Sequence, residues 1–232
     1  MIVQLPLGIK LRDGAAFANY FPGKNLEVVA YLQQHSGYKD EQCAYIWGGI
    51  GTGKTHLLQA ACHAVASRDV TTAYVPLSQA DEFPPSILEG MAELSLVCID
   101  DIHAVAGHAA WESALFDLYN RMREAGTQVF IAGNNPPGSL GIKLPDLASR
   151  LAWGAVFQLH PLNDEEKLEA LQLRAKTRGM DMPGDVARFL INRCQRDMPA
   201  LYSMLDQLDH ISLAAQRRLT IPFIKEFMGG HL

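Results

Sequence analysis

Residues 48–55 read Gly-Gly-Ile-Gly-Thr-Gly-Lys-Thr, so four residues separate a glycine from a Gly-Lys-Thr triplet. The apolar run 44–47 precedes this stretch, and the helical pattern of residues 56–61 follows it. A strand, a glycine-rich turn and a helix start, in that order, are typical of a phosphate-binding loop, or P-loop. The loop's backbone N–H groups turn inward on phosphate oxygens because glycine has no Cβ in the way, and the helix start adds free donors. The sequence therefore predicts a binding site for a nucleoside phosphate, ATP or ADP.

The motif assigns a role to each polar side chain of this loop. Lys54 reaches the β- and γ-phosphates, and the hydroxyl of Thr55 holds Mg²⁺. We expect the nucleotide phosphates to contact Gly49, Gly51, Thr52, Gly53, Lys54, Thr55 and His56.

Two acidic residues follow the apolar run 94–99 and are candidates for a second part of the nucleotide-binding site. A nearly continuous apolar run indicates a central parallel strand that is buried on both faces, and ligands bind at the carboxyl edge of such sheets. We assign Asp100 to the Mg²⁺ shell and Asp101 to the attacking water. Asn134 follows the predicted strand 129–132, where its amide can hydrogen-bond the γ-phosphate or the water. An asparagine in a turn before proline is an equally good interpretation.

The composition limits the class of protein and its compartment. The 232 residues are 48% hydrophobic and 19% charged, which is typical of a globular protein. A net charge of −5 argues against a dedicated nucleic-acid surface. No apolar run approaches the ~20 residues of a membrane span, and the first residues do not resemble a signal peptide. Four cysteines without paired spacing predict reduced thiols and no zinc site, so we expect a cytoplasmic protein.

The hydrophobic pattern predicts an α/β fold followed by a helical domain. Strands are expected over 44–47, 71–75, 94–100, 129–132 and 155–159, and helices over 56–61, 86–91, 110–124 and 144–151. From residue 163 onward only helical patterns occur, and Asn163 with Glu166 has the spacing of a capping box. We therefore expect an extended arm (1–13), a nucleotide-binding αβα domain with a five-stranded parallel sheet (14–160) and an all-α lid (161–232).

Aromatic residues before the first helix offer a second contact with the nucleotide. Phe17 and Tyr20 can pack against the base, with Asn25 beside them, although such aromatics are more often plain core. The arm has two interpretations as well: a disordered tail, or a short peptide that docks into a partner's groove.

Strands alternating with helices, followed by a small helical domain, resemble the AAA+ class of P-loop ATPases. Residues 47–58, 99–102 and 148–154 are very similar to the bacterial DnaA family. Residues 94–100, 116–121, 144–150 and 219–223 resemble the Hda family, the regulatory homologues of DnaA, and the similarity runs from about residue 4 to 228. The chain is expected to lack the helix-turn-helix domain with which DnaA binds duplex DNA.

The resemblance assigns two further sites. It implies that Gln4, Leu5 and Leu7 bind the DNA polymerase sliding clamp (β subunit), although the family pattern has one more residue in this peptide. It also implies that Arg150 is an arginine finger.

The resemblance extends to the two nucleotide sensors of the family. Asn134 matches the sensor-1 position, where relatives often carry Asp. Pro199 stands where relatives carry the sensor-2 arginine, and Arg193 and Arg196 lie near it in sequence but are not aligned.

The function implied by the resemblance is negative regulation of replication initiation. Bound to the DNA-loaded clamp, the protein would stimulate hydrolysis of DnaA-bound ATP through Arg150, with weak or no ATPase activity of its own. DnaA, the clamp and a second copy of the chain are the expected partners, with DNA reached only through the clamp at the bacterial nucleoid. The alternatives are an autonomous AAA+ ATPase, such as a helicase loader with Asp101 as its base, and a DNA-bound replication factor.

Overall fold

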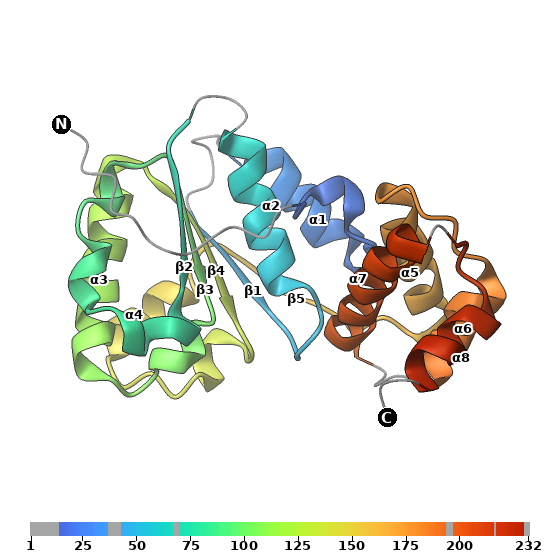
Figure 1. The fold of residues 1–232 in the computed structure, drawn as a ribbon. Helices are drawn as coiled ribbons and strands as arrows, with labels where there is room; N and C mark the ends of the chain where they lie inside the picture. Colours follow the sequence, from blue (N-terminus) through green and yellow to red (C-terminus); the bar gives the residue numbers. More distant parts are fainter. Residues whose placement is uncertain (1–13, 37–42, 67–69, 194–196, 216, 230–232) are drawn as a thin grey trace. The chain divides into compact units, whose positions relative to one another are not determined.

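A five-stranded parallel sheet organises the first part of the chain in the computed structural model, which describes residues 14–36, 43–66, 70–193, 197–215 and 217–229 (Figure 1). The strands are β1 (Cys43–Trp47), β2 (Thr72–Pro76), β3 (Leu96–Asp100), β4 (Gln128–Gly133) and β5 (Ala155–Gln158). Their order in the sheet is β2-β3-β4-β1-β5, and every pair is parallel. All five predicted strands and the central, fully buried position of β3 are confirmed.

Helices cover both faces of this sheet (Figure 1). They are α1 (Leu26–His35), α2 (Lys54–Ala66), α3 (Ala109–Ala125) and α4 (Pro145–Leu151). Side chains alternate between the faces along each strand, so Val97 and Ile99 pack with α3 and α4, whereas Leu96 and Cys98 pack with α1 and α2. The result is the three-layer αβα arrangement expected from the sequence.

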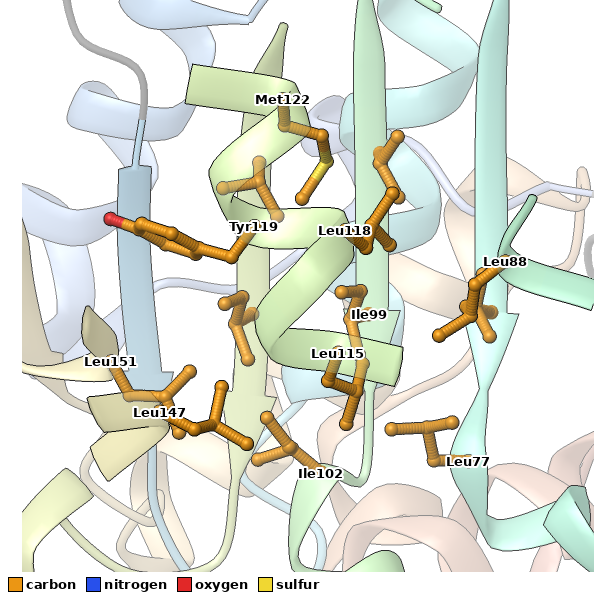
Figure 2. Close-up of a cluster of buried hydrophobic side chains, with 14 of the residues drawn as sticks. Leu77, Leu88, Ile99, Ile102, Leu115, Leu118, Tyr119, Met122, Leu147 and Leu151 are labelled. Atoms are coloured by element: carbon orange, nitrogen blue, oxygen red, sulfur yellow. The ribbon is translucent and has the colours of Figure 1, made fainter. Parts of the chain in front are cut away.

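Figure 2 shows the core on the α3–α4 side, where Leu115 and Leu118 of α3 and Leu147 of α4 meet Ile99 of β3. Leu118 is fully buried, and burying a leucine side chain stabilises a fold by about 1.5–3 kcal/mol. This core fixes α4, and therefore Arg150, against the sheet.

Short 3₁₀ helices fill several connections: Phe17–Asn19, Gly23–Asn25, Leu77–Glu82, Pro85–Leu88, Met91–Glu93, Ile102–Val105 and Pro137–Ser139. The helix predicted over residues 86–91 is wrong. Two 3₁₀ turns stand there instead, and Gly90 between them has φ = 79°, a left-handed conformation that breaks a helix.

The second compact unit is helical and consists of α5 (Asp164–Thr177), α6 (Gly184–Arg193), α7 (Met198–Ala215) and α8 (Ile221–Gly229), together with Phe21–Gly23 and Ile50–Thr52. The predicted capping box begins α5. The side chain of Asn163 accepts from the Glu166 N–H at 2.9 Å, and that of Glu166 accepts from the Asn163 N–H at 2.8 Å. Buried leucines of α6 and α7 form the core of this unit.

A buried carboxylate ties the start of α3 to the segment that leads into α4. Glu112 is 2% exposed and accepts backbone N–H groups from Gly107 at 2.6 Å and from Leu144 at 2.8 Å. The N–H of Lys143 donates to the same carboxylate at 3.0 Å. Burial alone would raise the pKa of Glu112, but these N–H groups and the charge of Lys143 outweigh it and hold the pKa below its usual range.

We expect Glu112→Gln to lower the free energy of unfolding at pH 7 by about 1–3 kcal/mol, because charge-assisted bonds to buried N–H groups are weakened. Since the folded-state pKa is depressed, the stabilisation is complete above the unfolded pKa and is lost as pH falls through the folded pKa. Urea unfolding at pH 7 and in acid should show the gap between wild type and variant closing as pH falls. Asp117→Asn, an exposed acid on the same helix, is the control. A gap that does not depend on pH would contradict this role of the Glu112 charge.

Candidate nucleotide-binding site

The P-loop connects β1 to α2, and Lys54 is the first residue of the helix. Its ammonium donates to the carbonyl oxygens of Gly48 at 2.7 Å and Gly49 at 3.0 Å, and the residue is only 9% exposed. Burial lowers the pKa of Lys54, while the charges of Asp100 and Asp101 oppose that shift. The ammonium group is therefore held at the P-loop by two backbone carbonyl oxygens, where it can contact a phosphate group.

Two glycines of the loop have backbone angles that favour glycine: φ is 79° at Gly51 and 92° at Gly53. At Gly53 space is also lacking, because a Cβ there would lie 2.4 Å from Cε2 of Tyr20. Tyr20 in turn lies 5.6 Å from the ring of His56, and Nε2 of His56 donates to the Ala16 carbonyl oxygen at 2.9 Å. The segment before α1 is thus fastened to the P-loop by Tyr20 and His56.

Asp100 is the centre of a hydrogen-bond network at the end of β3. Its Oδ2 accepts from the hydroxyl groups of Thr55 at 2.6 Å and Tyr74 at 2.7 Å, and its Oδ1 accepts from the Asp101 N–H at 3.0 Å. Only 1% of the residue is exposed. Burial and the charge of Asp101 raise the pKa of Asp100, although all three hydrogen bonds oppose the rise.

The donor set at this point fits Mg²⁺. A carboxylate oxygen and a threonine hydroxyl are hard oxygen ligands, and Mg²⁺ is bound by one or two such protein groups together with substrate phosphates and water. The structure brings Thr55 and Asp100, both assigned to Mg²⁺ from the sequence, into direct contact, and their binding of the metal stays a prediction.

Asp101 and Asn134 follow neighbouring strands, β3 and β4, and so stand at one edge of the sheet. Among the described residues other than glycine, Asp101 alone has a positive φ, 53°. Such strain of about 1–3 kcal/mol persists where the surroundings demand it, often at functional sites. Asn134 is exposed, and its role toward a γ-phosphate stays a prediction.

Asn25 holds the backbone of His160. Its amide oxygen accepts from the His160 N–H at 2.7 Å, and its amide nitrogen donates to the His160 carbonyl at 3.0 Å. Asn25 is 2% exposed, so this amide is occupied within the protein. Phe17 and Tyr20 pack on the core beneath α1 and α2, which is the plainer of the two predicted roles. A contact of these three residues with the base stays a prediction.

Arg150 lies apart from the P-loop, in the last turn of α4. Leu147 and Leu151 of that helix pack on the face of the sheet opposite to α2, which carries Lys54. The guanidinium carbon of Arg150 lies 4.5 Å from the ring centroid of Trp153. Within the described part of the chain, Arg150 forms no ion pair. Arg150 and Lys54 therefore belong to helices on opposite faces of the sheet, and the role of Arg150 as an arginine finger stays a prediction.

Gly154 makes possible the turn that holds Arg150 and Trp153. Its φ is 85°, and a Cβ on it would lie 2.3 Å from the backbone oxygen of Cys43. Because the obstacle is backbone of β1, we expect Gly154→Ala to cost about 3 kcal/mol or more in the free energy of unfolding. Gly126→Ala is the matched control, since Gly126 has φ = 74° with nothing within 4 Å. Equal losses of stability in the two variants, measured by denaturant unfolding, would refute the clash.

Several predicted residues lie outside the described part of the chain or away from the site. Gln4, Leu5, Leu7 and Arg196 are outside the described residues. Pro199 lies in the first turn of α7, a position that suits proline because its missing N–H needs no partner there. Arg193 ends α6, with its guanidinium 6.0 Å from the ring of Phe189.

Sequence reasoning missed two aromatic residues. Tyr74 of β2 gave no signal, because its role depends on β2 pairing with β3, which places it beside Asp100. Trp153 did carry a signal, because it follows the predicted arginine finger, Arg150, by three residues.

Comparison with known proteins agrees with this geometry. Residues 11–158 match the family model described as the bacterial DnaA ATPase domain, and residues 164–228 match the model described as the Hda lid domain. Among the residues described, no helix is long and apolar enough to cross a membrane.

Solved structures share the fold. Domain III of the replication initiation protein DnaA from Thermotoga maritima superposes with a TM-score of 0.79 at 21% identity, over 92% of this chain and 95% of that one. AMPPCP-bound DnaA from Aquifex aeolicus gives 0.69 at 20% identity, over 83% of this chain and 64% of that one. A replication initiator DnaA bound to AMPPCP and single-stranded DNA superposes with a TM-score of 0.71 at 19% identity, over 86% of this chain and 66% of that one. The chain thus spans about two thirds of these two longer DnaA chains.

Proposed function

The chain belongs to the family of bacterial DnaA ATPase domains and carries an Hda-type lid, and from this membership we propose that it switches off replication initiation by stimulating hydrolysis of DnaA-bound ATP. As a DnaA-homologous AAA+ protein, it is a regulator of replication initiation. The finer proposal concerns how it regulates: Arg150 enters the nucleotide site of DnaA and stabilises the charge of the transition state.

The observation that carries this proposal is the setting of Arg150. The guanidinium has no ionic partner among the described residues, and it lies over the ring of Trp153 just after α4, a helix on the side of the sheet away from α2. Phosphoryl transfer needs positioning and charge stabilisation more than covalent chemistry. A single arginine supplied from a second protein is worth about 10³–10⁵ in rate.

The chain's own P-loop acts, in this proposal, as a structural switch. Lys54 would hold the phosphates of ADP or ATP, and Thr55 and Asp100 would hold Mg²⁺; the bound nucleotide would thereby set the orientation in which Arg150 is presented to DnaA. The DnaA structures with AMPPCP support nucleotide binding by this fold. Mg²⁺, when bound, neutralises phosphate charge.

The sliding clamp, loaded on DNA, would recruit the protein through Gln4, Leu5 and Leu7. This restricts the switch to the nucleoid after replication has begun, and makes contact with DNA indirect. A dimer of the chain completes the proposed assembly.

A single assay tests the proposal. Phosphate release is measured from DnaA alone, from this protein alone, and from the mixture with clamp loaded on DNA. We expect the mixture to exceed the sum of the separate rates only when the clamp is on DNA. A mixture that equals that sum contradicts the proposal.

The second candidate is an autonomous AAA+ ATPase such as a helicase loader. The contact between Thr55 and Asp100 supports it, because these two side chains would hold Mg²⁺ for hydrolysis of the chain's own ATP. The same assay separates the two candidates: strong phosphate release by this protein alone supports the autonomous enzyme.

A further inference from the structure

Two arginines share one exposed indole on the surface formed by α3 and α4. The guanidinium carbon of Arg123 lies 5.0 Å from the ring centroid of Trp153, and that of Arg150 lies 4.5 Å from the same centroid. Trp153 is 47% exposed, which is unusual for so large an apolar side chain. A hollow of about 530 Å³ adjoins them and is lined by Asn120, Arg123, Glu124 and Arg150.

The charge of this cluster is not balanced from within the described chain. Neither Arg123 nor Arg150 forms an ion pair there, although Glu124 lines the same hollow. Guanidinium groups stay protonated, so both remain cations. An anion that both cations contact would gain two favourable charge interactions. The chain keeps this pair uncompensated despite an excess of acids that gives it a net charge of −5.

The indole supplies orientation. A guanidinium stacked on an aromatic face is held in a fixed plane, which leaves its N–H groups pointing outward for two parallel bonds to phosphate oxygens. Arg123 is exposed and stands in the last turn of α3, while Arg150 is half-buried in the last turn of α4. Trp153 thus lies beside two cations that come from different helices.

We propose that Arg123, Trp153 and Arg150 form one polyphosphate-binding site, with Arg123 as a second cation for the nucleoside triphosphate held by the partner subunit. The inference rests on the proposed function, which it extends from one arginine to two. Trp153 is a positioning residue, because it touches the cations and not the phosphates.

A structural role is the competing explanation for these arginines. Each stands at the carboxyl end of a helix, where a positive side chain stabilises the helix dipole. In that case Arg123→Ala lowers thermal stability and leaves anion binding unchanged. The two explanations therefore differ in whether Arg123→Ala changes thermal stability or anion binding.

The first experiment needs no partner protein. The full chain is saturated with ADP to occupy its P-loop and titrated with inorganic tripolyphosphate at low salt, with heat as the readout. We expect binding that weakens with salt, and about tenfold weaker binding in Arg123→Ala and in Arg150→Ala. Arg121→Ala is the matched control, because Arg121 is an exposed arginine of the same helix that does not line the hollow. Equal weakening by Arg121→Ala, or none by Arg123→Ala, overturns the site.

The second experiment uses DnaA with clamp on DNA and follows the concentration dependence of stimulated hydrolysis. We expect Arg123→Ala to raise the half-maximal concentration about tenfold, and Arg123→Lys to restore part of the loss. Trp153→Leu should lower the maximal rate, and Trp153→Phe should retain most of it, because an aromatic face remains for Arg150. Thermal unfolding midpoints within about 2–3 °C of wild type exclude misfolding.

The two hypotheses fail separately. If Arg150→Ala abolishes stimulation while Arg123→Ala behaves as wild type, the second cation is refuted and the proposed function stands. If wild type gives no stimulation at all, the proposed function fails, and the tripolyphosphate titration alone decides whether the two arginines form an anion site.

Discussion

Arg150→Ala is expected to reduce the stimulated rate of ATP hydrolysis by DnaA by a factor on the order of 10³ or more. The effect is large because the guanidinium would face charge that develops only in the transition state, where a fixed donor in a water-excluded site acts most strongly. The chain's own nucleotide affinity should stay at the wild-type level, since Arg150 lies on the opposite side of the sheet from α2. The measurement is single-turnover hydrolysis of labelled ATP on DnaA, with the variant in excess.

Two companion variants make this result specific. Arg150→Lys keeps the charge but loses the planar pair of N–H donors, so it should recover only a small part of the rate. Arg121→Ala removes an exposed charge from α3 and should stimulate as wild type does. If Arg150→Ala retains the wild-type rate at every concentration, Arg150 is not the group that acts on DnaA-bound ATP.

Local sequence signals predicted most of the sheet unit correctly. The phosphate-binding loop, the strand that ends at Asp100 and the helix of residues 110–124 each carry their pattern in a single contiguous stretch. The proximity of Thr55 and Asp100 was also to be expected, because the P-loop follows β1 and Asp100 ends β3, and the parallel strands of one sheet end at the same edge. Capping of α5 by Asn163 was predictable because Asn163 and its partner Glu166 lie only three residues apart in the sequence.

Long-range polar contacts could not be predicted in this way. Glu112 is bonded to the N–H of Leu144, and Asn25 to the backbone of His160, across 32 and 135 residues of sequence. The sequence around either residue does not indicate its partner, because the pairing depends on how α3, α4 and β5 pack. The site is affected too: Asn25 was predicted to lie beside the nucleotide base, its amide is bonded to the backbone of His160, and its contact with the base stays a prediction.

The position of Lys54 in the structure adds detail to the prediction that the P-loop binds a nucleotide. Its ammonium is bound to two carbonyl oxygens of the loop and is nearly buried, so the nucleotide meets a cation that is already oriented. Pre-organisation of this kind reduces the ordering required on binding. Lys54→Ala removes that cation together with its hydrogen bonds to phosphate.

We expect Lys54→Ala to weaken the binding of both ADP and ATP by about 100-fold. Charge-assisted hydrogen bonds contribute about 1.5–3 kcal/mol each, and 1.4 kcal/mol corresponds to a factor of ten in affinity. Isothermal titration of the nucleotide-free chain measures this directly, and Lys24→Ala, an exposed lysine of the same unit, is the control. The variant also leaves the Gly48 carbonyl without its ammonium donor, so the thermal unfolding of the free protein has to be compared first. Unchanged nucleotide affinity in a folded Lys54→Ala variant would refute the assignment of this loop. In that case, the proposed aiming of Arg150 by bound nucleotide fails with it.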